Sequence, residues 1–242
     1  MGKTAGILII GNEVLTGKVL DQNSPYLVRE LRALGVEVRR ITTIPDEVPV
    51  IAQEVKAFAE QYDLVFTTGG IGPTHDDVTI GAIASAFEKS VVRHPLLEGL
   101  LRRHYGEGIT ATQLKMAELP EGGELIEVGE MAFPVVVFRN VYIFPGIPEA
   151  VRRKFERIRE RFRDQPYVLR RVFLRCDEGH IAADLIRVMN RFPDLLLGSY
   201  PILHNPDYNV ELTLESKSAE YVEQALRFLL DCLSPHTIVR TE

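Results

Sequence analysis

The chain has 242 residues, which is long enough for one large domain or for a large and a small one, and its 45% hydrophobic content can fill a packed core. Its formal net charge of -6 gives no general field for attracting nucleic acid or an anionic membrane, so any phosphate binding has to be local. No apolar run reaches the length of a membrane span, and the two cysteines lack the spacing of a zinc site. We therefore expect a cytoplasmic protein with no membrane or nucleic-acid partner.

The first third of the chain alternates predicted strands with predicted helices. Residues 5–10 form an uninterrupted apolar run, which is typical of a central strand covered on both faces. A helix is expected after an N-cap at residue 23 or 24, and an edge strand is expected from residue 36. A second helix follows Asp46 and leads back to an apolar strand at 64–68. This order predicts an α/β fold with a doubly wound, mostly parallel sheet.

A glycine-rich turn follows the strand at 64–68. Glycines allow positive φ and leave backbone N–H groups uncovered, so this loop can wrap an anion at the N-terminus of the next helix. We expect that helix to open with Asp76 and Asp77, whose carboxylates would repel a bound phosphate unless a divalent cation lay between them. The loop indicates metal-assisted pyrophosphate chemistry or, with equal weight, an Asp76 that only caps the helix.

The middle of the chain is expected to extend the sheet. Two helical patterns within 94–119 indicate an insertion or lid. Strands are predicted at 125–128, 135–138 and 141–144. A two-residue hairpin at 139–140 joins the last two, and its asparagine is suited to a positive φ. The sheet should therefore gain an antiparallel pair.

The last third is predicted to form a separate domain. The helix that starts at Pro148 carries seven cations, Lys154 among them, which we interpret as a solvated exterior because glutamates interleave with them. The best boundary is at 164–166, which gives domains of 1–165 and 166–242. The second domain shows the order β-α-β-β-α-β of a small α+β split βαβ unit, without the Gly-x-x-Gly clamp that would indicate nucleic-acid binding.

The segment 68–79, TGGIGPTHDDVT, closely resembles the signature of the molybdopterin-binding (MoCF biosynthesis) superfamily. Segments 11–17, 44–47 and 141–148 narrow the resemblance to the N-terminal domain of the CinA (competence-damage-inducible) family and the molybdopterin-binding-like domain of eukaryotic FAD synthases. The resemblance implies a MoCF biosynthesis-like domain followed by a KH-like one. The sequence ends at Glu242 without the further C-terminal domains of such relatives, so neither amide hydrolysis nor FAD synthesis is expected of it.

The resemblance further implies a metal-dependent nucleotide pyrophosphatase, which hydrolyses nucleotide diphosphates such as ADP-ribose or FAD to monophosphates. One alternative is molybdopterin binding or adenylylation in molybdenum-cofactor biosynthesis. Another is a non-catalytic module that binds a phosphorylated pterin or a protein partner. The sequence shows no Ser-His-Asp or Cys-His arrangement, so a metal-activated water is expected rather than a covalent nucleophile.

The candidate site residues lie on loops that follow predicted strands. By the resemblance, Asp77 and Asp46 are the catalytic residues. Their oxygens are hard ligands suited to Mg²⁺, Mn²⁺ or Co²⁺, with K⁺ as an additional candidate, and the expected metal ligands are Glu13, Asp46, Asp76 and Asp77. The expected partners are a nucleotide or pterin phosphate and a second copy of the chain, with a homodimer favoured. The candidate substrate-binding residues are Gly11, Asn23, Thr68, Gly69, Gly70, Gly72, Pro73, Thr74, His75, Thr79, Pro145 and Gly146.

Overall fold

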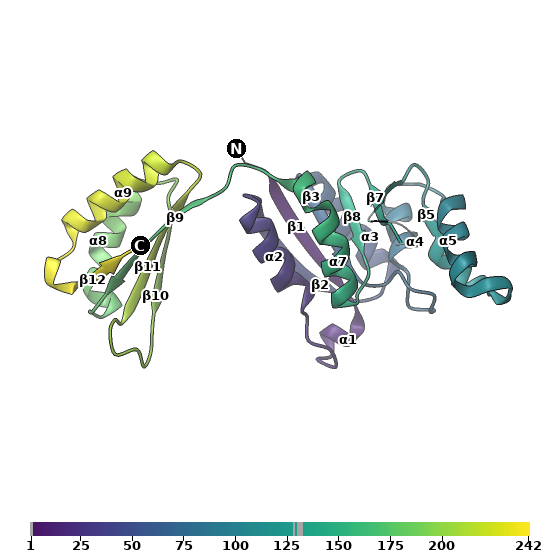
Figure 1. Ribbon diagram of the computed structural model, residues 1–242, viewed down its shortest axis with the longest axis horizontal. Coiled ribbons are helices and arrows are strands. Elements are labelled where there is room, and N and C mark those ends of the chain that lie inside the picture. The colour runs from purple at the N-terminus through teal and green to yellow at the C-terminus, as the bar shows by residue number, and fades with distance from the viewer. Residues whose placement is uncertain (1, 128, 130–132) are drawn as a thin grey trace. The chain divides into compact units, whose positions relative to one another are not determined.

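The computed structural model describes residues 2–127, 129 and 133–242, and contacts divide the chain into two units, 1–164 and 165–242 (Figure 1). Unit 1 contains a six-stranded sheet of order β2-β1-β3-β8-β7-β6. The first four strands are parallel, and β7 and β6 continue the sheet antiparallel. The strands are β1 (Thr4–Ile10), β2 (Glu37–Ile44), β3 (Leu64–Thr68), β6 (Glu124–Ile126), β7 (Val135–Phe138) and β8 (Val141–Phe144).

Helices cover both faces of this sheet, as the apolar runs of its central strands predict. Side chains of β1 alternate between the two layers: Ile7 and Ile9 pack with α2 and α7, whereas Leu8 and Ile10 pack with α3, α4 and α5. The α-helices are α1 (Asn12–Leu15), α2 (Asn23–Ala33), α3 (Val48–Gln61), α4 (Thr79–Ala86), α5 (Pro95–Tyr105), α6 (Ala111–Leu114) and α7 (Pro148–Ile158), and the 3-10 helices are η1 (Gly106–Gly108), η2 (Lys115–Ala117) and η3 (Arg159–Phe162). The doubly wound, mostly parallel fold is thus confirmed.

The segment between α4 and β6 differs from its expected form. Besides α5 and α6 it contains β4 (Val91–Arg93) and β5 (Glu118–Pro120), which pair antiparallel and tie the two ends of the insertion together. The strand expected at 125–128 is Glu124–Ile126, and residue 128 lies outside the described residues. Sequence periodicity missed β4 and β5 because three-residue strands are too short to show it.

The start of α4 and the turn residue of the β7–β8 hairpin differ from their predictions. Helix α4 begins at Thr79, so Asp76 and Asp77 precede the helix instead of opening it. In the β7–β8 hairpin, Arg139 takes the positive φ of 54°, while Asn140 has another role. Its side-chain amide donates hydrogen bonds to the carbonyls of Ala59 at 3.0 Å and Tyr62 at 2.8 Å, fastening the end of α3 to the sheet.

Unit 2 is an antiparallel four-stranded sheet of order β10-β11-β9-β12 with two helices on one face. Its elements are β9 (Val168–Leu174), α8 (Glu178–Arg191), β10 (Leu196–Pro201), β11 (Val210–Ser216), α9 (Ala219–Cys232), η4 (Pro235–Thr237) and β12 (Ile238–Thr241). Val210, Leu212 and Leu214 of β11 are buried, and their neighbours along the strand are not. This alternation gives the sheet one packed face and one open face, as its sequence pattern predicts.

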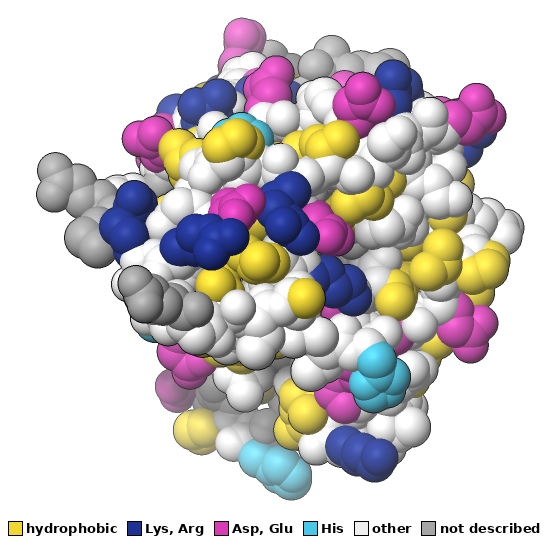
Figure 2. Space-filling model, turned by 90° about the vertical axis from the view of Figure 1, so that its right-hand side faces the viewer, with side chains coloured by type: hydrophobic (Ala, Val, Ile, Leu, Met, Phe, Trp, Pro, Cys, Tyr) yellow, Lys and Arg dark blue, Asp and Glu magenta, His cyan; other side chains and the backbone are white. Residues whose placement is uncertain are grey.

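Charges on the surface of unit 1 are mixed. Figure 2 shows Lys and Arg side chains interspersed with Asp and Glu side chains and hydrophobic groups on the face that lies to the right in Figure 1. On α5, for example, Arg102 pairs with Glu98 at 2.6 Å across one helical turn. Such mixing weakens any single-sign field on this face. No helix in the described parts of the chain is long and apolar enough to cross a bilayer.

We expect Asn140→Asp to destabilise unit 1 by about 1–3 kcal/mol, because the carboxylate cannot donate to the two carbonyls that the amide satisfies. Urea unfolding followed by circular dichroism would measure the change. A free energy of unfolding within about 0.5 kcal/mol of the parent would show that the amide does not fasten α3 to the sheet.

Candidate functional site

The carboxyl ends of β1, β2, β3 and β8 meet at one edge of the sheet in unit 1. Two backbone hydrogen bonds connect the residue that follows one strand to the last residue of its neighbour. The Gly11 N–H, after β1, donates to the Ile44 carbonyl of β2 at 3.1 Å, and the Gly69 N–H, after β3, donates to the Phe144 carbonyl of β8 at 3.2 Å. Open α/β sheets bind ligands at this edge. The structure therefore brings together four loops that carry most of the candidate residues.

Two glycines let the loop after β3 leave the strand at a sharp angle. Gly69 has a φ of 106°, and a Cβ atom there would lie 2.0 Å from the carbonyl oxygen of Ile10. Gly70 has a φ of 66°, and a Cβ atom there would lie 2.3 Å from Oγ1 of Thr79. No side chain fits at either position, so both glycines are required by backbone shape.

Thr79 closes this loop onto the first turn of α4. Its hydroxyl donates to the Gly69 carbonyl at 2.9 Å and its N–H donates to the Gly70 carbonyl at 3.0 Å, and the side chain is fully buried. The N–H groups of Gly70, Ile71 and Gly72 donate to no other described residue. Successive free N–H groups form the kind of concavity that binds anions. The loop thus has three N–H donors in a row without a partner among the described residues.

Asn23 joins two strand ends from the start of α2. Its amide donates to the Gly146 carbonyl at 2.8 Å and to the Thr68 hydroxyl at 3.4 Å, and its buried Oδ1 has no partner in the described structure. The expectation that residue 23 or 24 caps α2 is wrong. Asp21 accepts from the N–H groups of both residues instead, at 2.8 and 3.1 Å, which leaves the Asn23 side chain at the sheet edge.

Asp46 and Asp77 each use one carboxylate oxygen to hold a loop. Asp46 Oδ2 accepts from the Asn12 N–H at 2.8 Å, and its Oδ1 faces Gly70, 3.6 Å from where a Cβ would stand. Asp77 Oδ2 accepts from the Thr74 N–H at 2.8 Å and from the Thr74 hydroxyl. The Asp77 carboxylate also covers Gly72, where a Cβ would lie 2.7 Å from Oδ2. Each carboxylate keeps one oxygen without a hydrogen bond to the described chain.

The other candidate residues lie further out. His75 and Asp76 are exposed, with 97% and 58% of their side-chain surfaces accessible. Glu13 folds back over Gly11, 2.5 Å from the position of a Cβ there. Pro73 lies within the outer part of the loop, and Pro145 directly follows β8.

A convergent set of four carboxylates is therefore not formed. Among the described residues, no three His, Cys, Asp or Glu side chains lie close enough to hold a metal ion by themselves. The physical reason is that the Asp46 and Asp77 carboxylates are each engaged by a backbone N–H, of Asn12 and of Thr74, while the Glu13 carboxylate lies over Gly11. Asp46 and Asp77 stay next to the glycine loop, whereas Glu13 and Asp76 turn away to local contacts.

Two lysines at the site were not found from the sequence. Lys115 comes from the insertion, and its Nζ donates to the carbonyls of Asp77 at 2.6 Å and Thr74 at 3.2 Å. It therefore holds in place the turn at 74–77, which we call the acidic loop. Nothing near Lys115 in the sequence indicates this contact, which spans 38 residues.

The solvated-exterior interpretation of α7 is wrong for Lys154, which is only 8% exposed. Its Nζ donates to the carbonyls of Phe133 at 2.6 Å and Pro134 at 2.7 Å. Burial, followed by the charge of Arg153, lowers the pKa of Lys154 to about 8. Helical spacing could have indicated the burial, because Lys154 lies three residues after Val151 and beside Phe155 on the apolar stripe.

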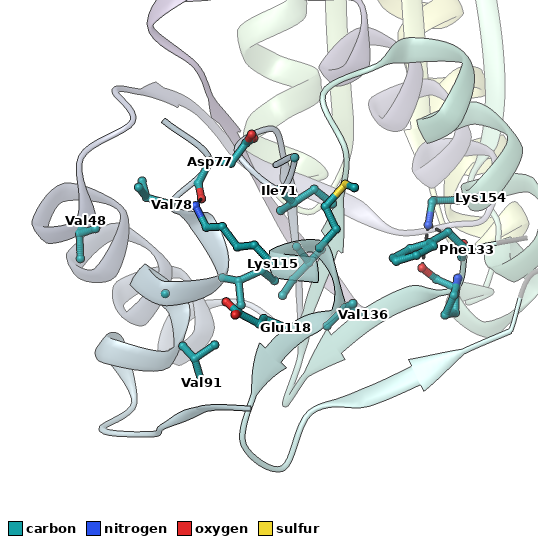
Figure 3. A pocket seen from close by; sticks show the side chains of 16 residues that line it. Val48, Ile71, Asp77, Val78, Val91, Lys115, Glu118, Phe133, Val136 and Lys154 are labelled. Atoms are coloured by element: carbon teal, nitrogen blue, oxygen red, sulfur yellow. Dashed lines mark hydrogen bonds between the residues drawn. The ribbon is translucent and has the colours of Figure 1, made fainter. Parts of the chain in front are cut away.

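A cavity of about 250 Å³ runs from the acidic loop into the insertion. Figure 3 shows Asp77 and Lys115 toward one end and Phe133 with Lys154 toward the other. Its lining is mostly apolar, with contributions from α4, β7 and β8. The lining residues are Val48, Ile71, Gly72, Asp77, Val78, Ile80, Gly81, Val91, Lys115, Met116, Glu118, Phe133, Pro134, Val136, Ile143 and Lys154.

Comparisons with known proteins match this architecture. Residues 6–164 match the family described as probable molybdopterin binding domain, and residues 166–242 match the middle domain of FAD synthase. The crystal structure of CinA from Thermoplasma acidophilum superposes with a TM-score of 0.62 at 27% identity, over 66% of this chain and 98% of that one. The chain therefore belongs to the molybdopterin-binding domain family.

Similar full-length sequences define its relatives further. A protein of Archaeoglobus fulgidus is 35% identical over 91% of this chain and 94% of its own length. A probable FAD synthase of Caenorhabditis elegans is 31% identical over 98% of this chain, and a CinA-like protein of Thermotoga maritima is 27% identical over 97%. The chain spans only 51% and 59% of these last two relatives. The resemblance to CinA-like proteins and FAD synthases is confirmed.

Titration of Lys154 should appear in the pH dependence of stability. Its pKa is about 8 when folded and 10.5 when exposed, so the unfolded chain binds the extra proton between these values. The penalty for burying the cation is complete below pH 8 and disappears as the pH rises toward 10.5. Between pH 8 and pH 10.5, we expect the free energy of unfolding of the parent to rise by on the order of 3 kcal/mol relative to that of Lys154→Met.

Chemical denaturation at several pH values would measure this difference. Lys56→Met is the matched control, because Lys56 lies exposed on α3 and its loss should leave the parental pH profile unchanged. Parallel profiles for the parent and Lys154→Met would contradict the lowered pKa.

Proposed function

We propose that unit 1 hydrolyses the phosphoanhydride bond of nucleotide diphosphates such as ADP-ribose or FAD, with a divalent metal ion. One observation carries this proposal: three successive N–H groups, at 70–72, donate to no other residue in the described chain, and Asp46 lies beside Gly70 and Asp77 beside Gly72, each with an oxygen available. Donors next to carboxylates suit a phosphate that arrives with a cation. The relation to FAD synthases supports a nucleotide as the ligand.

The residues present fit a divalent ion that binds together with its phosphate ligand. Mg²⁺ is commonly held by one or two carboxylates plus substrate phosphates, whereas a protein-only cage needs more ligands than this chain supplies. The free oxygens of Asp46 and Asp77 and the unpaired Oδ1 of Asn23 are all hard donors. When bound, such an ion polarises the phosphate and lowers the pKa of a coordinated water.

The chain's own groups orient the substrate and stabilise charge. The N–H groups of residues 70–72 hold phosphate oxygens as negative charge develops on them. Lys115 keeps the Thr74–Asp77 turn in place through two carbonyl contacts and adds a positive charge beside it. Asp46 and Asp77 direct a fixed oxygen each toward the loop, so little reorganisation is needed when the ligand arrives.

Molybdopterin binding or adenylylation is the second candidate function. The observation that favours it is the match of residues 6–164 to the probable molybdopterin binding domain family. The same N–H groups and carboxylates would serve a phosphorylated pterin. Product analysis separates the two functions: AMP formed from ADP-ribose or FAD and water supports the hydrolase, and turnover that requires both molybdopterin and ATP supports the transferase.

We expect hydrolysis of ADP-ribose or FAD to stop when divalent ions are removed, because the Asp46 and Asp77 carboxylates would repel a phosphate whose charge no cation neutralises, and no ion would activate the attacking water. Protein treated with EDTA and then dialysed would be assayed by chromatography of the monophosphate products. Addition of Mg²⁺, Mn²⁺ or Co²⁺ should restore product formation. Full activity after exhaustive chelation would show that no metal takes part.

We expect Asp77→Asn to reduce hydrolysis by about a thousandfold while the protein stays folded. The asparagine oxygen can still accept from Thr74, so the free energy of unfolding should fall by only about 1 kcal/mol, but the negative charge is lost. Steady-state kinetics at saturating metal and thermal melting would measure both effects.

Asp76→Asn is the matched control, since Asp76 lies exposed on the same turn and should tolerate the change with near-parental activity. Near-parental turnover by Asp77→Asn would contradict its proposed catalytic role. A much lower melting temperature would instead identify Asp77 as mainly structural.

A further inference from the structure

We propose that the cavity beside the acidic loop binds the ring of the substrate, a planar heterocycle with an exocyclic amino group, and that Glu118 accepts a hydrogen bond from that amino group. This inference rests on the proposed function, because it takes the phosphate of the same ligand to lie at residues 70–72. The cavity starts at Gly72 and Asp77, so a phosphate on the loop would place a ring at its entrance.

The size and lining of the cavity suit one ring system. A volume of about 250 Å³ lies below the roughly 300–1,000 Å³ of sites that enclose an entire drug-sized ligand, so it accommodates one part of a nucleotide. The walls of the cavity present apolar groups, among them the aliphatic Ile80 and Val136 and the aromatic ring of Phe133. An aromatic heterocycle can exchange contact with water for contact with these side chains.

Glu118 supplies the polar contact. It lies on β5 and lines the cavity near Lys115, as Figure 3 shows. The two lysines of the cavity already donate to backbone carbonyls, whereas the half-buried Glu118 carboxylate pairs with no other side chain in the described structure. A carboxylate only accepts hydrogen bonds, so the ring group opposite it has to be a donor such as an amino group.

Gly81 allows the cavity to be filled without disturbing the fold. It lies in α4 and lines the cavity, and a Cβ atom built on it meets nothing within 4 Å. Leucine also favours a helix more than glycine does. Gly81→Leu should therefore fold and place a side chain in the space proposed for the ring. Gly99→Leu is the matched control, because Gly99 is a helical glycine of α5 outside the cavity, and a Cβ atom built on it would meet only the flexible Arg103 side chain, at 3.8 Å.

Calorimetric titration of the full chain with Mg²⁺ would test the site using four probes: AMP, adenosine, ribose 5-phosphate and purine riboside 5′-monophosphate, which lacks the amino group. We expect the parent and Gly99→Leu to bind AMP at least about tenfold more tightly than ribose 5-phosphate. Gly81→Leu should bind AMP no more tightly than ribose 5-phosphate, and it should not bind adenosine. Its affinity for ribose 5-phosphate should equal that of the parent. Parental affinity of Gly81→Leu for AMP would overturn the proposal.

Comparing AMP with purine riboside 5′-monophosphate, which lacks the amino group, tests the proposed contact with Glu118. The parent should prefer AMP over purine riboside 5′-monophosphate by about tenfold, and Glu118→Ala should bind the two equally. Glu121→Ala, which removes an exposed glutamate after the same strand, should keep the preference. Retention of the preference by Glu118→Ala would overturn the role of Glu118.

The outcomes separate this inference from the proposed function. Adenosine bound by the parent and rejected by Gly81→Leu, without any hydrolysis of ADP-ribose or FAD, would support the ring site and contradict the hydrolase. Hydrolysis with equal parental affinity for AMP and ribose 5-phosphate would contradict the ring site alone.

Discussion

In unit 1, the sheet edge at the carboxyl ends of β1, β3 and β8 depends on one close approach, the contact of Gly69 with the carbonyl of Ile10. Because no Cβ intervenes, the chain can turn at the end of β3 directly against the end of β1, and the Gly69 N–H can reach the end of β8. Three strand ends are thus drawn together at one residue. The buried hydroxyl of Thr79 then fixes the turn from the helix side, so the N–H groups after it stay uncovered.

This part of the structure could be predicted from sequence because its cause is local. Consecutive glycines after a buried apolar run can be explained by backbone shape alone, and the apolar runs at 5–10 and 64–68 indicate strands covered on both faces. The loops that follow parallel strands share one edge by topology. Gly11, Asp46, Gly70 and Gly146 are therefore grouped correctly at that edge without knowledge of any side-chain contact.

The remainder depends on contacts between distant segments, which no local pattern contains. Asp77 reads as the start of a helix, yet its carboxylate binds Thr74 and closes a separate turn that delays α4 to Thr79. Lys115 reaches that turn across 38 residues. The sequence pattern groups Lys154 with the surface cations of α7, although its partners are two carbonyls just before β7, 21 and 20 residues earlier. Charge alone does not distinguish a solvated lysine from one that is buried and satisfied.

Asp46 and Asp77 each have one carboxylate oxygen in a hydrogen bond and one without, which orients their side chains although they form no metal cage by themselves. One oxygen of each carboxylate is held by a backbone N–H, of Asn12 or of Thr74, so the direction of the other oxygen is set when the protein folds. Ordering these side chains therefore adds little to the entropy lost on binding. In the proposed site, two carboxylates alone would hold a cation weakly, and phosphate oxygens of the substrate would complete its shell. In the proposed reaction, metal and substrate would then bind together, and the N–H groups at 70–72 would select ligands that carry a phosphate.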